Sequence, residues 1–235
     1  MEGAGVSQGR APITAIVFDL DGTLVDSVPD LHAAANRLMS EMQLAPLEIA
    51  TVTSFVGNGI PTLVERCLAA AGSKASEAET RVAVARFKSL YAEEPAIRTV
   101  IYPGVVEALD AFQAAGYGLG VCTNKSEALA RAVLRDVGLG DKFSVVIGGD
   151  TLATHKPDPE GLLSAIDALA STPDTALYVG DSEVDAETAA RGRVAFALFA
   201  NGYRKAPLAE LPHWHAFDNL HQLALDIGLV PAAGE

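Results

Sequence analysis

The sequence predicts an α/β fold: a doubly wound parallel sheet core, Rossmann-like in architecture, with an inserted all-helical cap. Three observations lead to this prediction. A run rich in Ile and Val over 13–18 ends in two acidic residues, as a buried strand of a parallel sheet does. Residues 28–97 then show only helical periodicity. From 102 onward, short apolar runs alternate with helical patterns, which is typical of parallel βα units.

The predicted core contains five strands and the helices between them. Glycines end two of these helices, at Gly116 and Gly138, and Pro159 can start a third. We expect strands at 13–18, 117–122, 143–147, 176–179 and 194–199, and helices over 105–116, 129–138, 159–169 and 220–227. This alternation places the strands side by side in one parallel sheet.

The predicted cap begins where Pro29 can open a helix. Apolar residues over 60–71 recur with the spacing of an amphipathic helix, and a further helix is expected over 76–93. Because this segment interrupts the chain directly after the first strand, we expect it to form a separate unit. The predicted division is a flexible tail over 1–12, an α/β core over 13–27 and 98–230, and a helical cap over 28–97.

Composition and charge limit the classes of partner. The chain of 235 residues has 17 basic and 30 acidic residues, a net charge of −13, which repels nucleic acid and anionic membranes. Cys67 and Cys122 lie in apolar patterns without a CxxC motif, which predicts buried thiols in a reducing compartment. No apolar run approaches the ~20 residues of a membrane span. We expect a cytoplasmic protein without nucleic-acid or membrane partners.

Polar motifs follow four of the predicted strands. The carboxyl ends of parallel strands share one edge of the sheet, so these motifs are expected to converge. Two carboxylates at the mouth of an apolar strand are unfavourable unless a cation or a proton offsets them. A hard metal such as Mg²⁺, with a phosphate as a further partner, suits them. The motifs are DLDGT at 19–23, CTNK at 122–125, the lysine of HKPDP at 155–159, and GDSEVD at 180–185.

These four motifs, in this order and spacing, resemble the haloacid dehalogenase-like superfamily of phosphohydrolases. The resemblance covers residues 13 to about 205, and the helical insertion matches the small cap of the superfamily's first subclass. Within it, DLDGTLVDS, VGNG at 56–59 and GYRK at 202–205 look most like the phosphoglycolate phosphatases.

The resemblance implies a role for each catalytic and phosphate-binding residue. Asp19 would be the nucleophile that forms an aspartyl-phosphate, and Asp21 would be the general acid and then the general base. Thr123 and Lys156 would hold the oxygens of the phosphoryl group, and Asn124 and Lys125 are further candidates that either support the site or are exposed. The alternatives are that the aspartates only begin a turn, that Thr123 only ends a strand, and that the lysine is solvated.

The resemblance also implies a Mg²⁺ site. Asp19, the backbone carbonyl of Asp21 and Asp181 would hold the ion, with Asp185 as outer support. Asp185 can equally be an acid that favours the N-terminus of a helix. One departure from the family pattern follows the fourth motif: Arg191-Gly192-Arg193 stands where Ala-Gly is usual, which leaves the end of that helix open.

Two cap residues are further candidates for the site. The Gly57-Asn58-Gly59 segment predicts a tight turn that faces the active-site cleft. Arg66 lies on the polar side of its helix, where it either meets solvent or reaches a substrate carboxylate. We also expect the cap to move about two connections, near 24–28 and 98–103.

The favoured function is therefore a Mg²⁺-dependent phosphatase acting on a small phosphorylated metabolite, with 2-phosphoglycolate as the preferred substrate. Phosphatases of the same type on sugar phosphates, nucleotides or pyrophosphate, and a β-phosphoglucomutase-like isomerase, are the alternatives. True dehalogenases of the superfamily lack the second aspartate, which is present here as Asp21. A non-catalytic binding protein is disfavoured because both aspartates and the lysine are present. The sequence leaves open whether the protein is a monomer or a dimer.

Overall fold

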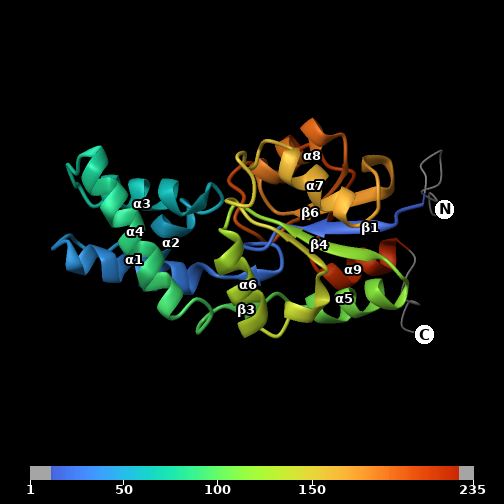
Figure 1. Cartoon of the computed structure of the whole chain (residues 1–235), viewed down its shortest axis with the longest axis horizontal. Coiled ribbons are helices and arrows are strands. Elements are labelled where there is room, and N and C mark those ends of the chain that lie inside the picture. The colour runs from blue at the N-terminus through green and yellow to red at the C-terminus, as the bar shows by residue number, and fades with distance from the viewer. Residues whose placement is uncertain (1–11, 228–235) are drawn as a thin grey trace.

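The computed structural model describes residues 12–227. Residues 1–11 of the predicted tail lie outside this range. So do residues 228–230, the last residues of the predicted core. The described chain has two parts, a group of helices at one end and an α/β core at the other (Figure 1). No helix within 12–227 is both long enough and apolar enough to cross a membrane.

A six-stranded sheet forms the centre of the core, in the order β5-β4-β1-β6-β7-β8, and every pair of neighbours is parallel. The predicted doubly wound sheet is confirmed. The strands are β1 (Ala15–Phe18), β4 (Gly118–Cys122), β5 (Val145–Ile147), β6 (Ala176–Gly180), β7 (Ala195–Phe199) and β8 (His215–Phe217). The chain leaves β1 toward β4 and leaves β6 toward β7, so the order reverses between β1 and β6, where α/β sheets bind ligands.

Helices cover both faces of this sheet. On one face lie α5 (Val105–Ala114), α6 (Glu127–Asp136) and α9 (Leu220–Asp226), and on the other α7 (Glu160–Ala168) and α8 (Glu183–Gly192) (Figure 1). All four residues of β1 are buried because apolar side chains from both helical layers pack against them. Burial on both faces explains why β1 reads as a continuous apolar run rather than an alternating one.

Four helices make up the inserted segment: α1 (Val28–Glu41), α2 (Ile49–Thr53), α3 (Gly59–Ala70) and α4 (Glu77–Glu93). They enclose their own hydrophobic cluster, which includes Leu38, Val64 and Phe87. The predicted helix starts are confirmed: proline occupies the first turn of α1, and a capping box formed by Ser76 and Glu79 begins α4. The exact domain limits, 28 and 97, stay a prediction.

Three short strands were not predicted. β2 (Val25–Asp26) and β3 (Val100–Ile101) form an antiparallel ribbon at the two connections between core and cap. Two residues are too few to show a periodicity. The third is β8, a three-residue edge strand whose first two residues are only half-buried, so it lacks the apolar run of a central strand.

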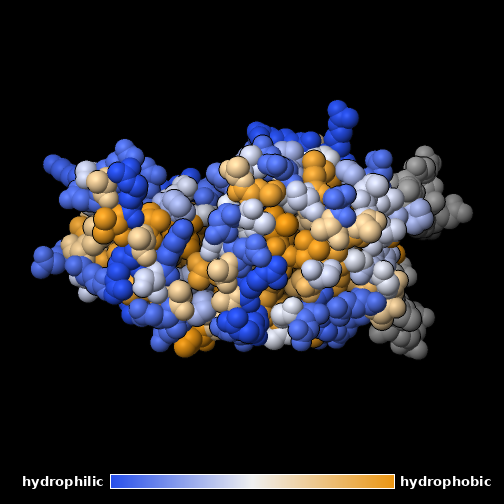
Figure 2. Space-filling view, in the orientation of Figure 1, coloured by the Kyte–Doolittle hydropathy of each residue, from blue (hydrophilic) through white to orange (hydrophobic). Residues whose placement is uncertain are grey.

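Both cysteines are buried free thiols, as the sequence predicts. Burial raises the pKa of Cys67 to about 11 and that of Cys122 to about 12. Figure 2 shows polar side chains along much of the outline of the molecule, and apolar side chains at the surface both across the middle of that face and over part of the cap.

The unusual Arg191-Gly192-Arg193 segment forms the end of α8. Gly192 is its last residue, and a Cβ there would stand 3.4 Å from the ring of Pro159. Arg193 follows in the left-handed conformation, with φ 56°, which glycine usually adopts at this position.

We predict that Arg193→Gly raises the free energy of unfolding by about 1 kcal/mol, because it removes the steric cost of a side chain in the left-handed region. Urea denaturation would measure the change. Arg191→Gly in the last turn of the same helix is the matched control and should lower stability by about 1 kcal/mol. A destabilising effect of Arg193→Gly would contradict the argument.

Candidate active site

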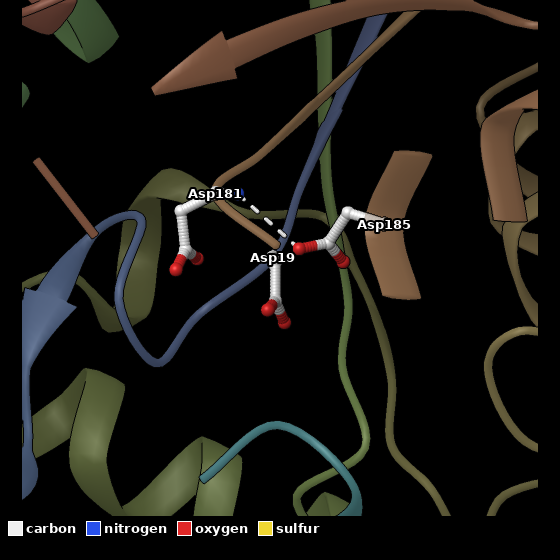
Figure 3. A group of neighbouring side chains, drawn as sticks. All are labelled: Asp19, Asp181 and Asp185. Carbon is white, nitrogen blue, oxygen red and sulfur yellow. Dashed lines mark hydrogen bonds between the residues drawn. The ribbon is translucent and has the colours of Figure 1, made fainter. Parts of the chain in front are cut away.

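Two buried aspartates lie where the strand order reverses. Asp19 follows β1 and Asp181 follows β6, and the two residues are 7% and 1% exposed. The backbone N–H of Asp19 donates to the carbonyl of Val179 at 2.8 Å, which fixes the end of one strand against the other. Figure 3 shows these two side chains converging with that of Asp185, which comes from the first turn of α8.

The three carboxylates are close enough to share one ion. One oxygen from each of Asp19, Asp181 and Asp185 lies within 4.8 Å of the others. Oδ1 of Asp19 is buried and accepts no hydrogen bond, although Nζ of Lys156 stands 3.0 Å away. Oxygen donors and an unfilled carboxylate position fit a hard divalent cation such as Mg²⁺.

Burial makes these carboxylate charges unfavourable without a cation. It raises the pKa of Asp19 to about 6, with Lys156 acting in the opposite direction. Burial also raises the pKa of Asp181 well above its ordinary range, and the charges of Asp185 and Asp19 add to that effect. A bound cation would offset both desolvation and mutual repulsion.

The loops leave space for Asp181 and supply its hydrogen bonds. The hydroxyl of Thr23 donates to Oδ1 at 2.7 Å, and the backbone N–H of Tyr203 donates to Oδ2 at 2.6 Å. A Cβ at Gly22 or Gly202 would lie within 2.5 Å of an Asp181 side-chain atom. Only glycine therefore permits both loops to approach this carboxylate.

Both carboxylate oxygens of Asp185 already accept hydrogen bonds from the protein. Its Oδ1 accepts from Lys156 at 2.6 Å and from the hydroxyl of Tyr178 at 2.8 Å. Its Oδ2 accepts from the hydroxyl of Ser182 at 2.6 Å and from two backbone N–H groups. Despite opposing burial, the ammonium of Lys156 holds the pKa of Asp185 below its ordinary value. Asp185 closes the capping box of α8, which confirms its alternative role at the N-terminus of a helix, and its role as outer support for Mg²⁺ stays a prediction.

Lys156 is a buried cation beside the Asp19 carboxylate. It is 4% exposed, and its Nζ also contacts the hydroxyl of Tyr178 at 2.9 Å. Burial favours the neutral amine, yet the charges of Asp185 and Asp19 keep the pKa of Lys156 above its usual value. The alternative of a solvated surface lysine is wrong.

Asp21 does not belong to the group of three carboxylates and has different partners. Both of its oxygens accept from Nζ of Lys125, at 2.6 and 2.8 Å, and Oδ1 also accepts from the hydroxyl of Ser27. The side chain of Asp21 is 14% exposed and lines the cavity between core and cap, so it can meet a bound molecule.

Thr123 and Asn124 follow β4 at the same edge. Thr123 is 4% exposed, and its hydroxyl oxygen accepts from the backbone N–H of Lys125 at 3.2 Å, which leaves the hydroxyl hydrogen for a ligand. The amide of Asn124 donates to the carbonyls of Gly57 at 3.0 Å and Lys156 at 3.1 Å, so it joins the cap turn to the core. Its Oδ1 is buried without a partner.

The two cap candidates have different positions. Asn58 lines a small hollow that it shares with Asp19 and Asp181, as expected for a turn that faces the cleft. The guanidinium of Arg66 donates to Oδ1 of Asn58 at 3.1 Å and to the carbonyl of Phe55 at 3.4 Å. Arg66 therefore braces the turn from behind and does not line either hollow beside the aspartates.

The cavity between core and cap measures about 40 Å³. Its floor is polar, and its roof consists of cap residues that are mostly apolar. The lining residues are Asp19, Asp21, Thr123, Asn124 and Lys125 below, and Leu31, Val56, Gly57, Gly59, Ile60 and Leu63 above. A larger surface hollow of about 790 Å³, between α3 and α4, contains none of the candidate site residues.

Several of the described residues that contact the site residues received no role from the sequence. Thr23 and Tyr203 hold Asp181, Ser27 holds Asp21, Tyr178 joins Lys156 to Asp185, and Tyr91 contacts Lys125. Thr23 and Tyr203 lie inside motifs that the resemblance already used, but no spacing rule predicts which atoms they contact. Nothing in the sequence near Tyr91 distinguishes it from an ordinary core aromatic residue.

Comparison with known proteins agrees with this geometry. A family model described as haloacid dehalogenase-like hydrolase matches residues 13–193. The chain belongs to this family, and the predicted resemblance is confirmed, as is the expectation of a hydrolytic enzyme.

Relatives within the family share most of the chain. A protein of Cereibacter sphaeroides named phosphoglycolate phosphatase is 45% identical over 208 residues, which cover 88% of this chain and 94% of that protein. One of the same name from Rhodospirillum rubrum is 42% identical, with 94% and 93% covered. The crystal structure of a predicted phosphoglycolate phosphatase from Haemophilus somnus 129pt has a TM-score of 0.86 and 30% identity, with 92% and 99% covered.

We predict that Asp19→Asn stabilises the metal-free protein near neutral pH by up to about 3 kcal/mol, since it removes a buried charge. The folded pKa, about 6, lies above the ordinary value of 3.8, so the wild-type protein loses stability as the pH rises through this window. The advantage of the variant should therefore vanish near pH 4. Urea denaturation in chelator at several pH values would measure it.

Asp185→Asn is the control for this experiment. It should destabilise the protein by about 3 kcal/mol because it removes a partner of the buried Lys156. If both substitutions changed the free energy of unfolding equally, the expected contrast between an unfavourable charge at Asp19 and a favourable charge at Asp185 would be wrong.

Proposed function

We propose that the protein is a Mg²⁺-dependent phosphatase that hydrolyses a small phosphate monoester, with 2-phosphoglycolate as its preferred substrate. One observation carries the proposal: Asp19 has a buried carboxylate oxygen without a hydrogen bond, beside Lys156, next to the cavity that Asp21 also lines. A nucleophile, a fixed cation and an acid–base group thus meet at one place.

In the first step, the carboxylate of Asp19 attacks phosphorus. The bond between phosphorus and the ester oxygen breaks as the bond to Asp19 forms, which gives an aspartyl-phosphate. Asp21 gives a proton to the departing alkoxide. Lys156 and the hydroxyl of Thr123 hold the phosphoryl oxygens, and both groups are buried and fixed before the substrate arrives.

In the second step, water replaces Asp19 on phosphorus. Asp21, now ionised, takes a proton from the water as it attacks, and the bond between phosphorus and Asp19 breaks. Inorganic phosphate leaves, and Asp19 and Asp21 return to their starting states. One carboxyl group therefore serves as acid and then as base.

Asp19, the backbone carbonyl of Asp21 and Asp181 would hold Mg²⁺, with Asp185 as outer support. When bound, the ion would reduce the repulsion between the carboxylate nucleophile and the phosphate dianion. Thr23 and Tyr203 keep Asp181 in place for this task, through hydrogen bonds of 2.7 and 2.6 Å.

Cap movement is part of the proposal. The cavity of about 40 Å³ has room for only a few water molecules, since each needs roughly 10–15 Å³ of such space, so a phosphate ester needs more room than this arrangement gives. The connections near 24–28 and 98–103 are the proposed hinges of a cap over 28–97. Both contain a strand of the β2–β3 ribbon, which joins them.

The substrate preference rests on the names of relatives that are 42–45% identical. Sugar phosphates, nucleotides and pyrophosphate remain the competing substrates. A β-phosphoglucomutase-like isomerase would use the same aspartyl-phosphate, but it would need a bisphosphate primer and release little phosphate.

The test is phosphate release from 2-phosphoglycolate, hexose phosphates, nucleotides and pyrophosphate, with and without Mg²⁺. We expect 2-phosphoglycolate to be turned over fastest. Removal of the metal or the change Asp19→Asn should lower turnover by at least about 10³-fold, because each removes a component of phosphoryl transfer.

Arg37→Gln, at a partly exposed ion pair with Glu93 in the cap, is the control and should leave turnover unchanged. If another ester were turned over fastest, with the same dependence on Mg²⁺ and on Asp19, only the proposed substrate would be wrong. No phosphate release from any ester in the presence of Mg²⁺ would overturn the phosphatase.

A further inference from the structure

We propose that Lys125 is a positioning residue for Asp21, and that Tyr91 of the cap holds Lys125 in the required place. This inference rests on the proposed role of Asp21 as acid and base. It assigns a task to a buried lysine whose ammonium contacts Asp21 and Tyr91, outside the group formed by Asp19, Asp181 and Asp185.

Lys125 has a complete set of partners. Its ammonium has three N–H donors, and it contacts both oxygens of Asp21, at 2.6 and 2.8 Å, and the hydroxyl of Tyr91, at 3.0 Å. The residue is 5% exposed. All three donors have acceptors, so the ammonium is not free for a phosphoryl oxygen while this arrangement lasts.

The backbone of Lys125 is fixed as firmly as its side chain. Its N–H donates to the hydroxyl oxygen of Thr123 at 3.2 Å, and its carbonyl accepts from Gly149 at 2.8 Å. The segment that presents the phosphate-binding hydroxyl therefore also presents the ammonium. Together with the hydroxyl of Ser27, this ammonium sets where the Asp21 carboxylate lies relative to the phosphoryl site.

Tyr91 adds the cap to this arrangement. It lies on α4, is 1% exposed and stacks on Phe87, with ring centroids 6.2 Å apart, within the hydrophobic cluster of the cap. The ammonium of Lys125 also stands 4.9 Å from the centre of the Tyr91 ring, within the range of a cation–π contact.

The contact between Lys125 and Tyr91 exists only while the cap packs against the core. Leu129 of α6, in the core, is part of the same hydrophobic cluster as Tyr91, which shows that the two parts are packed together at this point. When the cap moves away, Lys125 loses one acceptor and its cation–π contact, and its hold on Asp21 changes. The position of the acid–base group is thereby linked to the position of the cap.

The experiment compares esters that differ in their need for a proton on the leaving group. Acetyl phosphate releases acetate, which needs none, whereas ethyl phosphate and 2-phosphoglycolate release alkoxides. In Lys125→Met, we expect kcat/KM to fall by about 10²-fold for the alkoxide esters and by less than about 5-fold for acetyl phosphate, because only the former depend on a placed acid.

Tyr91→Phe keeps the ring and removes the hydroxyl. It should lower the ratio of kcat/KM for ethyl phosphate to kcat/KM for acetyl phosphate by about 5-fold, the same direction as in Lys125→Met. Tyr117→Phe is the matched control, because that ring packs against Phe112 in the core, and it should leave the ratio unchanged. If circular dichroism shows that Lys125→Met does not fold, the ratio measured in Tyr91→Phe tests the proposal instead, and an unchanged ratio would overturn it.

Other outcomes overturn the inference in distinct ways. Equal losses for all three esters would show that Lys125 only supports the structure. A raised KM confined to 2-phosphoglycolate, with ethyl phosphate unaffected, would make Lys125 a contact for the substrate carboxylate instead. If the wild-type protein hydrolyses none of the three, the proposed function itself fails.

Discussion

Electrostatic compensation of buried carboxylates governs this structure. Asp19, Asp181 and Asp185 lie together in a site that water barely reaches, and Lys156 is the cation that contacts two of them. An uncompensated buried charge costs several kcal/mol, so much of the surrounding structure serves to reduce this cost. Glycines let two loops approach Asp181, and Ser182 and Tyr178 donate to Asp185.

Two buried lysines divide the acidic residues into two sets. Lys156 contacts Asp185 and Asp19 on the side where a metal fits, and Lys125 holds Asp21 on the side of the cap. This division leaves one oxygen of Asp19 without a hydrogen bond while Asp21 is fully bonded. The two aspartates are two residues apart in sequence, yet their surroundings prepare them for different chemistry.

The sequence predicts those parts of the fold and the site that depend on local pattern and on sheet topology. The central strands are apolar runs, and residues that follow parallel strands must share an edge, which is why Asp19, Thr123, Lys156 and Asp181 could be placed in advance. The two-residue strands β2 and β3 are too short to carry a pattern. Contacts such as Lys125 with Tyr91 depend on how the cap helices pack on the core, which no spacing along the chain expresses.

The cap completes the site without supplying a charge to it. Its lining residues are mostly apolar, and its one arginine near the turn, Arg66, braces Asn58 from behind. With a net charge of −13, the protein as a whole repels anions at long range, and the two buried lysines are the local positive charges beside the aspartates. These charges act strongly only where water is excluded, and the apolar roof provides that exclusion. Tyr91, in the cap, contacts Lys125, so the position of this charge depends on how the cap packs against the core.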